Sequence, residues 1–297
     1  MFQIVNGDPD VKSHLQLLLH EQGAQETGLE EFLMILDETE KSYGSWWVAV
    51  DEFKEPRVAL TVNYHDDLSY IRAVWTRVFD MEDAELASKQ LLEQWVTNSK
   101  RRVKKFQADL PLYSPLVNSL LETGFTKEKI LRATYEVATD WHAEDIPDGY
   151  EMRGVTREEL PEIYDKLIGP DFDPSSPLYI RKGDFLGFVS NLPDSAFNSW
   201  VVVTDDEGRK VGFAGSFLSI DRKQPVAIMY GPHSKEPVVT RAIIAEMLSY
   251  WKSVEIKKLK ILRTNEFHPN TIQRFDLDLV FESIRFVGDK TNLSFKP

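Results

Sequence analysis

The strongest constraint on the fold of this 297-residue chain is a weak internal repeat. Each half contains two apolar runs joined by a polar turn: Trp47–Val50 with Arg57–Val62, and Trp200–Val203 with Lys210–Ala214. Trp47 and Trp200 are 153 residues apart, and Val58 and Val211 have the same separation. Apolar runs on both sides of a polar turn are typical of a β-hairpin. Two anchors at one spacing predict a duplicated unit of roughly 150 residues.

The elements that flank the two hairpins are predicted to follow in the same order. In the first copy, strands and helices are expected at Phe2–Val5, Leu29–Thr39, Tyr70–Arg77, Ala84–Asn98 and Val103–Ala108. Their counterparts in the second copy are Tyr150–Arg153, Lys182–Asn191, Val226–Tyr230, Val238–Lys252 and Leu259–Arg263. Thr156 and Glu159 have the spacing of a capping box, which predicts a helix start after the strand that opens the second copy.

Each copy is predicted to close with a short helix and a last strand. The first closing helix ends at Leu121–Phe125 and precedes a strand at Ile130–Val137, whereas the second ends at Leu277–Phe281. Phe125 and Phe281 are 156 residues apart, so the repeat drifts by three residues over its length. A polar stretch with proline and glycine, Thr139–Gly149, is typical of a domain junction. We therefore expect an N-terminal domain at residues 1–140 and a C-terminal domain at 148–297.

Composition and charge exclude several classes of protein. Hydrophobic residues make up 42% of the chain, which is typical of a folded globular protein. The absence of cysteine excludes disulfides, thiolate metal sites and a cysteine nucleophile. The N-terminus lacks the pattern of a signal peptide, and no apolar run reaches the roughly 20 residues that span a bilayer. A cytoplasmic protein without membrane association is expected.

The formal net charge of −13 disfavours nucleic acid as a partner and favours a cationic substrate such as an amine. The cationic run at Lys100–Lys105 is interpreted as a solvated helix end, with phosphate binding as the alternative. The six histidines lack metal-site spacing, so no metal is predicted. Ser216 is misplaced for a nucleophile elbow, and the phosphate-loop pattern is absent.

The order of elements resembles the GNAT family of acyl-CoA-dependent N-acyltransferases, in two degenerate copies. Arg209–Ala214 is similar to the family's second hairpin strand, and Gly124–Phe125 to the end of its closing helix. The resemblance implies an α/β fold of the α+β type. Each of two tandem units would have a mixed, mostly antiparallel central sheet flanked by helices.

The resemblance also implies a coenzyme site where the central strand of the second copy opens into the long helix. Amide groups at a helix N-terminus bind pyrophosphate, and glycines let the chain approach it. Tyr230-Gly231-Pro232 is similar to the strand exit of the family, which places Lys235 at its Arg/Gln position. The acetyl-CoA-binding residues implied are Met229, Gly231, Ser234, Lys235, Val238, Val239, Thr240 and Asn270. A capped helix start without a ligand, with Asn270 as a helix N-cap, is the alternative.

The family pattern is incomplete at several of these positions. Glu236, Val238 and Thr240 stand where the family has glycine or alanine. In the first copy the same loop, Phe79-Asp80-Met81-Glu82-Asp83, has three carboxylates that would repel a pyrophosphate. The second copy is therefore predicted to bind the coenzyme, and the first to be a degenerate scaffold.

Acyl transfer needs a base for the incoming ammonium and often an acid for the thiolate. Neither closing helix contains the tyrosine that the family often uses as the acid. Tyr230 replaces it by location, and Glu266 is the candidate base; packing and surface roles are the alternatives. The first hypothesis is an N-acetyltransferase that acts on a small amine by direct transfer in a ternary complex. The second is a non-catalytic binding or regulatory protein that keeps the fold.

Overall fold

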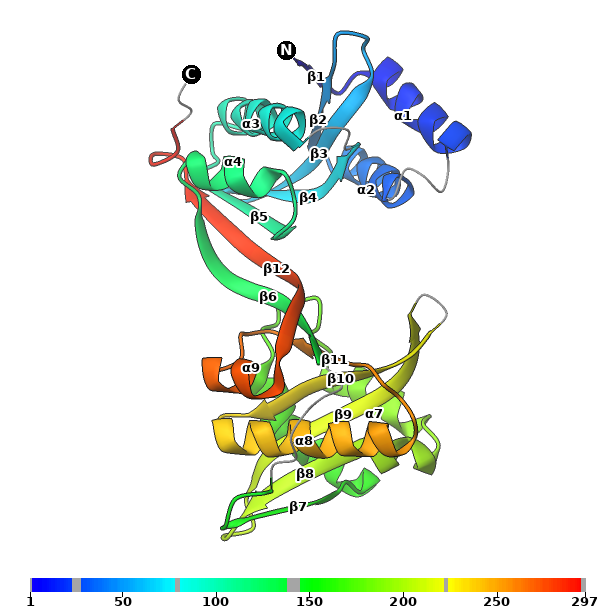
Figure 1. Cartoon of the computed structure of the whole chain (residues 1–297). Coiled ribbons are helices and arrows are strands. Elements are labelled where there is room, and N and C mark those ends of the chain that lie inside the picture. Colours follow the sequence, from blue (N-terminus) through cyan, green and yellow to red (C-terminus); the bar gives the residue numbers. More distant parts are fainter. Residues whose placement is uncertain (1, 23–27, 78–80, 138–144, 222–223, 295–297) are drawn as a thin grey trace. The chain divides into compact units, whose positions relative to one another are not determined.

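The computed structural model describes residues 2–22, 28–77, 81–137, 145–221 and 224–294 (Figure 1). The chain divides into two compact units. Unit 1 contains residues 1–129 and 284–297, and unit 2 contains residues 130–283. The repeats proposed at 1–140 and 148–297 stay a prediction, because compact units concern contacts within the folded chain and not duplication.

Unit 1 is a mostly antiparallel sheet with helices on both faces. Its elements are β1 (Gln3–Asn6), α1 (Pro9–Gln22), α2 (Leu29–Lys41), β2 (Ser45–Val50), β3 (Pro56–His65), β4 (Leu68–Thr76), α3 (Met81–Thr97), β5 (Lys105–Pro111) and α4 (Leu116–Glu122). The strand order is β1-β2-β3-β4-β5-β12, and β5 runs parallel to β4. Leucines of α1 and α2 pack on Trp46 and Trp75 against one face. On α3, Trp95 contacts Phe106 edge-on at 5.1 Å and stacks on Phe125 at 5.9 Å.

Unit 2 repeats this arrangement with more irregular helices. It contains β7 (Tyr150–Gly154), the 3₁₀ turn η2 (Arg157–Glu159), α5 (Leu160–Ile163), the π-helical turn η3 (Tyr164–Ile168), α6 (Gly169–Asp171), α7 (Lys182–Ser190), the 3₁₀ turn η4 (Asp194–Ser199), β8 (Trp200–Asp205), β9 (Lys210–Asp221), β10 (Gln224–Ser234), α8 (Pro237–Ser253), β11 (Leu259–Arg263) and α9 (Pro269–Phe275). The strand order is β6-β11-β10-β9-β8-β7, and β11 is parallel to β10. The predicted mixed, mostly antiparallel sheets flanked by helices are confirmed.

The last strand of each unit comes from the other half of the chain. β6 (Thr126–Val137) leaves unit 1 and pairs antiparallel with β11, with Tyr135 opposite Ile261. β12 (Leu277–Asp289) leaves unit 2 and ends beside β5, where Arg285 forms an ion pair with Asp109. Unit 1 is therefore complete only with residues after 283.

The two faces of the unit 2 sheet carry separate cores. Val203, Met229 and Ile261 belong to the core beneath α8 and α9 (Figure 1). Trp200 and Phe213 belong to the core beneath η3 and α7. Because side chains alternate along a strand, the even and odd positions of β8 to β10 fall on different faces.

Two sequence expectations require comment. The closing helix predicted to end at Leu277–Phe281 is wrong at its end, because α9 stops at Phe275 and β12 begins at Leu277. Asp276 adopts a left-handed conformation (φ 47°, ψ 56°) that terminates the helix. Part of the predicted junction, residues 139–144, lies outside the described residues.

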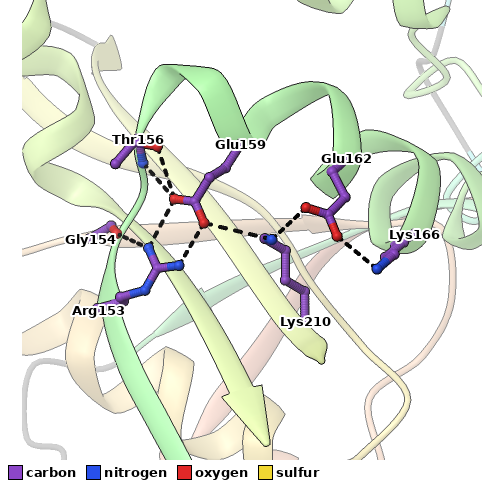
Figure 2. Close-up of polar contacts among 7 residues, drawn as sticks. All are labelled: Arg153, Gly154, Thr156, Glu159, Glu162, Lys166 and Lys210. Carbon is purple, nitrogen blue, oxygen red and sulfur yellow. Dashed lines mark hydrogen bonds and ion pairs between the residues drawn. The ribbon is translucent and has the colours of Figure 1, made fainter. Parts of the chain in front are cut away.

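An ion network fixes the start of the helical segment that follows β7 (Figure 2). Glu159 accepts bonds from the backbone and hydroxyl of Thr156, as its capping-box position predicts, and from Arg153 at 2.6 Å. Lys210 of β9 lies 3.7 Å from Glu159 and 2.6 Å from Glu162. The Arg153 guanidinium lowers the pKa of Glu159 to about 2, and Lys166, followed by Lys210, lowers the pKa of Glu162 to about 2.

These pKa values predict an acid-sensitive helix start. A carboxyl with a depressed folded pKa stabilises the fold above its ordinary value of 4.5, and that contribution is lost as the pH falls toward 2. We expect Arg153→Met to flatten the decrease of the thermal midpoint between about pH 5 and about pH 3. Arg181→Met is the control, because Arg181 is exposed and has no recorded ion pair among the described residues. An equal decrease in both variants would contradict this assignment.

Candidate active site

The central feature of unit 2 is a bulge near the end of β10. Tyr230 is opposite Leu262 in the last recorded pair between β10 and β11. On the other side of β10, Tyr230 pairs with Gly215 of β9, but the next recorded pair is His233 with Phe213. Three steps on β10 therefore match two on β9, which is a β-bulge. Beyond the bulge, no pairing of β10 with β11 is recorded, so the described strands part here.

The bulge turns His233 to the face of the sheet beneath α7. Without the extra residue, His233 would share a face with Met229 because side chains alternate. Instead its ring stacks on Phe213, with centroids 6.1 Å apart and planes at 14°. Gly231 permits this turn: its φ is +97°, and a Cβ there would lie 2.7 Å from the His233 backbone nitrogen. A side chain at position 231 is therefore incompatible with this backbone.

His233 is held by Asp171 from α6. Its Nδ1 lies 2.8 Å from Asp171 Oδ2, and the imidazole is 3% exposed. Phe172 contacts the ring edge-on at 5.1 Å. A carboxylate oxygen only accepts hydrogen bonds, so this contact places a proton on Nδ1, and in the neutral form of the ring the free electron pair is then on Nε2. Nε2 has no recorded hydrogen bond among the described residues, so it can accept a proton from a ligand.

The same face holds an apolar cavity of about 460 Å³, with His233 in its wall. Its lining residues come from η3 to β10: Ile168, Phe172, Ile180, Phe185, Phe188, Trp200, Phe213, Gly215, Phe217, Leu218, Ser219, Ile228, Tyr230 and His233. This volume is within the usual range of small-molecule sites. The network of Figure 2 fixes the beginning of the helical segment whose later residues, Ile168 and Phe172, line this cavity.

Arg263 closes the gap between β10 and β11. It is 8% exposed and donates a hydrogen bond to the Pro232 carbonyl at 3.0 Å. It also donates to Asn265 Oδ1 at 2.6 Å, and its guanidinium stacks on Phe267 at 4.2 Å. Burial lowers the pKa of Arg263, and the nearby Asp171 carboxylate opposes that shift. Asp171 is thus close to both the buried imidazole of His233 and the buried guanidinium of Arg263, at the ends of β10 and β11.

The start of α8 can accept an anion. Thr240 donates its amide to the Glu236 carbonyl, which leaves the amides of Val238 and Val239 as the free donors of the first turn. Lys235 is exposed beside them. The Glu236 carboxylate, which would repel a phosphate, is bound by the Tyr150 hydroxyl. The residues present therefore fit a phosphate group, although Ser234 already accepts a bond from the Glu236 amide at 3.1 Å.

The other residues proposed from the sequence are scattered around this site. Tyr230 lines the cavity. The side chain of Met229 is buried in the core beneath α8, which leaves its backbone for any ligand contact. Glu266 is exposed, and Asn270 is exposed with its amide donating to His268 Nδ1 at 3.3 Å. His268, rather than Asn270, is the N-cap of α9.

The corresponding region of unit 1 is built differently. Between the ends of β4 and α3 lies a cavity of about 430 Å³ whose lining includes Asp51, Glu55 and Asp83. Arg57 is paired with Asp51 at 2.5 Å, and Arg77 with Glu55 at 2.8 Å. Carboxylates therefore face a cavity where the family resemblance would place a pyrophosphate. Phe79 and Asp80 of the predicted acidic loop lie outside the described residues.

Comparison with known proteins identifies the fold. A GCN5-related N-acetyltransferase from Sphaerobacter thermophilus aligns with a TM-score of 0.52 at 10% identity, over 97% of this chain and 96% of that one. The chain has the GNAT fold. A tandem GNAT protein from the clavulanic acid biosynthesis pathway aligns with a TM-score of 0.45 at 10% identity, over 98% and 99%. A GNAT-family acetyltransferase from Colwellia psychrerythraea gives 0.49 at 11% identity, over 96% and 99%.

No protein-family model and no curated protein matches the sequence. The structure describes no helix long and apolar enough to cross a membrane. Within the described ranges, no group of three or more histidine or acidic side chains is arranged to hold a metal ion.

The pair of His233 and Asp171 is a candidate functional feature that the sequence analysis did not find. The two residues are 62 positions apart and meet only because the bulge reverses the face of His233. The sequence offered one signal, Gly231-Pro232 before a histidine at the end of the central strand.

Arg263 is predicted to be a large contributor to the stability of this strand end. Arg263→Met removes buried charged hydrogen bonds and leaves the Pro232 carbonyl without this donor. We expect the free energy of unfolding of unit 2 to decrease by about 1.5–3 kcal/mol. Urea unfolding followed by tryptophan fluorescence measures this change, with the exposed Arg181→Met as the control. A change below about 0.5 kcal/mol would show that the bridge is unimportant.

Proposed function

We propose that the chain is an acyl-CoA-dependent N-acyltransferase whose second unit transfers an acyl group to a small amine. The observation that carries this proposal is the pair of His233 and Asp171 in the wall of the cavity, at the point where β10 and β11 part. A histidine oriented by a carboxylate is suited to act as a general base. The GNAT fold suggests acyl transfer from acyl-CoA as the reaction, and the residues of the site suggest the class of substrate.

The reaction joins the amine to the acyl group in one ternary complex. His233 Nε2 accepts a proton from the substrate ammonium, and the electron pair freed on its nitrogen forms the new C–N bond. The second proton that the nitrogen loses after bond formation replaces the one that Tyr230 gives to the sulfur. The acyl-CoA supplies an activated thioester, and its C–S bond breaks as the amide forms. Tyr230 lies beside the cavity and is placed to return a proton to the sulfur. Asp171 stabilises the cationic imidazole that exists between the two proton transfers.

The coenzyme phosphates would be held at the start of α8. The free amides of Val238 and Val239 and the ammonium of Lys235 supply the donors, and the backbone of Met229–Gly231 borders the gap. The backbone amides there would polarise the thioester carbonyl. We propose a cytoplasmic protein whose net charge of −13 favours a cationic small molecule over nucleic acid.

Coenzyme binding has a direct test at Lys235. Acetyl-CoA that binds the native state must raise the thermal midpoint by mass action. We expect a rise at millimolar acetyl-CoA in the native chain and its loss in Lys235→Glu, because the new carboxylate repels the phosphates. Lys257→Glu, an exposed lysine just beyond the other end of α8, is the matched control and should keep the rise. No rise in the native chain would contradict acyl-CoA binding.

The base has a test of its own. Asp171→Asn would place an amide donor against Nδ1, force the proton onto Nε2 and remove the free electron pair. We expect kcat to decrease by roughly 10²- to 10⁴-fold in both Asp171→Asn and His233→Gln, with little change in acetyl-CoA binding. The thiol released from acetyl-CoA reports kcat, and the thermal midpoint reports binding. Full activity in His233→Gln would refute its role as the base.

The second candidate is a non-catalytic binding protein, and the bridge of Arg263 favours it. In the family the acyl-CoA arm passes between the two strands that Arg263 joins here, so the guanidinium has to move before an acyl-CoA can enter. A rise in midpoint with acetyl-CoA, without thiol release for any amine tested, would favour this candidate. Thiol release that depends on His233 would exclude it.

A further inference from the structure

The cavity beside His233 is unusual in its chemistry. Its lining, taken over the described residues, contains no aspartate, glutamate, lysine or arginine. Half of the lining residues are phenylalanine, tyrosine or tryptophan, and Trp200 contacts two of these rings, Phe213 at 5.8 Å and Phe217 at 5.3 Å. Among the lining residues, Ser219, Tyr230 and His233 carry polar side-chain groups, and the buried indole N–H of Trp200 has no recorded partner among the described residues. A ligand here must therefore bury an apolar surface.

The position of the cavity identifies which reactant it holds. The start of α8 and the core beneath it lie on one face of the sheet, and the cavity residues lie on the other. Once the Arg263 guanidinium has moved from the Pro232 carbonyl, a thioester that reaches through the gap after Tyr230 meets the cavity at His233, whose Nε2 has no recorded hydrogen bond among the described residues. The cavity would therefore hold the amine that attacks the thioester, with its nitrogen at His233.

The size and rim of the cavity set the shape of this molecule. An apolar cavity of about 150 Å³ holds benzene, so about 460 Å³ is room for a body of two or three rings. At the rim, Phe188 of α7 is 49% exposed and Leu218 of β9 is 58% exposed. Phe188 packs edge-on against Phe217 at 5.6 Å. The apolar wall thus continues to the surface, where a longer substrate can extend.

We propose that the substrate is a primary amine carried on an aromatic or bulky aliphatic body, and not a polar amine such as an amino sugar or a polyamine. This inference rests on the proposed acyltransferase function and specifies its acceptor. The aromatic rings attract the ammonium group as it enters, and His233 removes its proton. The apolar body fills the cavity, which excludes water from the reacting nitrogen.

The test compares two primary amines, one with an aromatic ring and one with a short polar chain. With 1 mM acetyl-CoA, thiol release is measured for 2-phenylethylamine and for ethanolamine. We expect kcat/KM to be at least roughly 100-fold higher for 2-phenylethylamine. Its phenyl ring buries several carbon atoms in the cavity, and in an apolar pocket one buried methylene alone contributes about tenfold or more. Equal values, or a preference for ethanolamine, would overturn the apolar class and leave the transferase function standing.

Binding without coenzyme separates the two proposals. Calorimetric titration of 2-phenylethylamine into the native chain should give saturable binding that weakens roughly tenfold in Phe188→Ala, since that change removes a ring from the rim. Leu279→Ala is the control, because Leu279 is 46% exposed, lies on β12 and does not line the cavity. Binding that is identical in both variants would overturn the assignment of the cavity. Binding without thiol release would instead overturn the transferase function.

Discussion

The site of unit 2 depends on one extra residue in β10. The bulge after Tyr230 sets the face of His233, and the pairing with β11 is recorded no further than Tyr230. Gly231 makes the turn possible, since its left-handed conformation and the close approach of His233 exclude a side chain. A β-bulge beside an active site commonly redirects a side chain. Here it places a buried imidazole in the wall of an apolar cavity, beside the point where the recorded pairing of β10 and β11 ends. In the proposed reaction, this is the position between the two reactants.

The fold was largely predictable because its signals are local. The apolar runs that begin at Trp47 and Trp200, the polar turns that follow them and the capping box of Glu159 each reflect short-range physical preferences. The partner of each last strand was not predictable. β6 and β12 both alternate apolar residues with polar ones, so each pattern fits either sheet edge, and long-range packing decides between them. The end of α9 was missed because Asp276 supplies the left-handed residue where glycine is the usual signal.

The candidate site was predictable only where its residues are neighbours in the sequence. Lys235 and the free amides of α8 lie next to each other in the sequence, and Tyr230 was located by its place at the end of the central strand. Asp171 lies in an irregular segment 62 residues before His233, and no spacing relates the two. Glu266 was proposed as a base from the same kind of reasoning as Tyr230, but it is exposed, whereas the buried imidazole is 3% exposed and oriented. Burial and orientation are properties of the folded chain.

The exchange of last strands gives the first half of the chain a structural role in unit 2. Unit 1 has carboxylates and arginines around the cavity beside the start of α3. Yet its half of the chain supplies β6, which pairs with β11 and places Tyr135 against Phe267 at 5.0 Å, beneath the stacked Arg263 guanidinium. Loss of the first half would leave β11 with an open edge on the side away from β10. The segment of the first half that forms β6 is thus required by the sheet of unit 2 for structure.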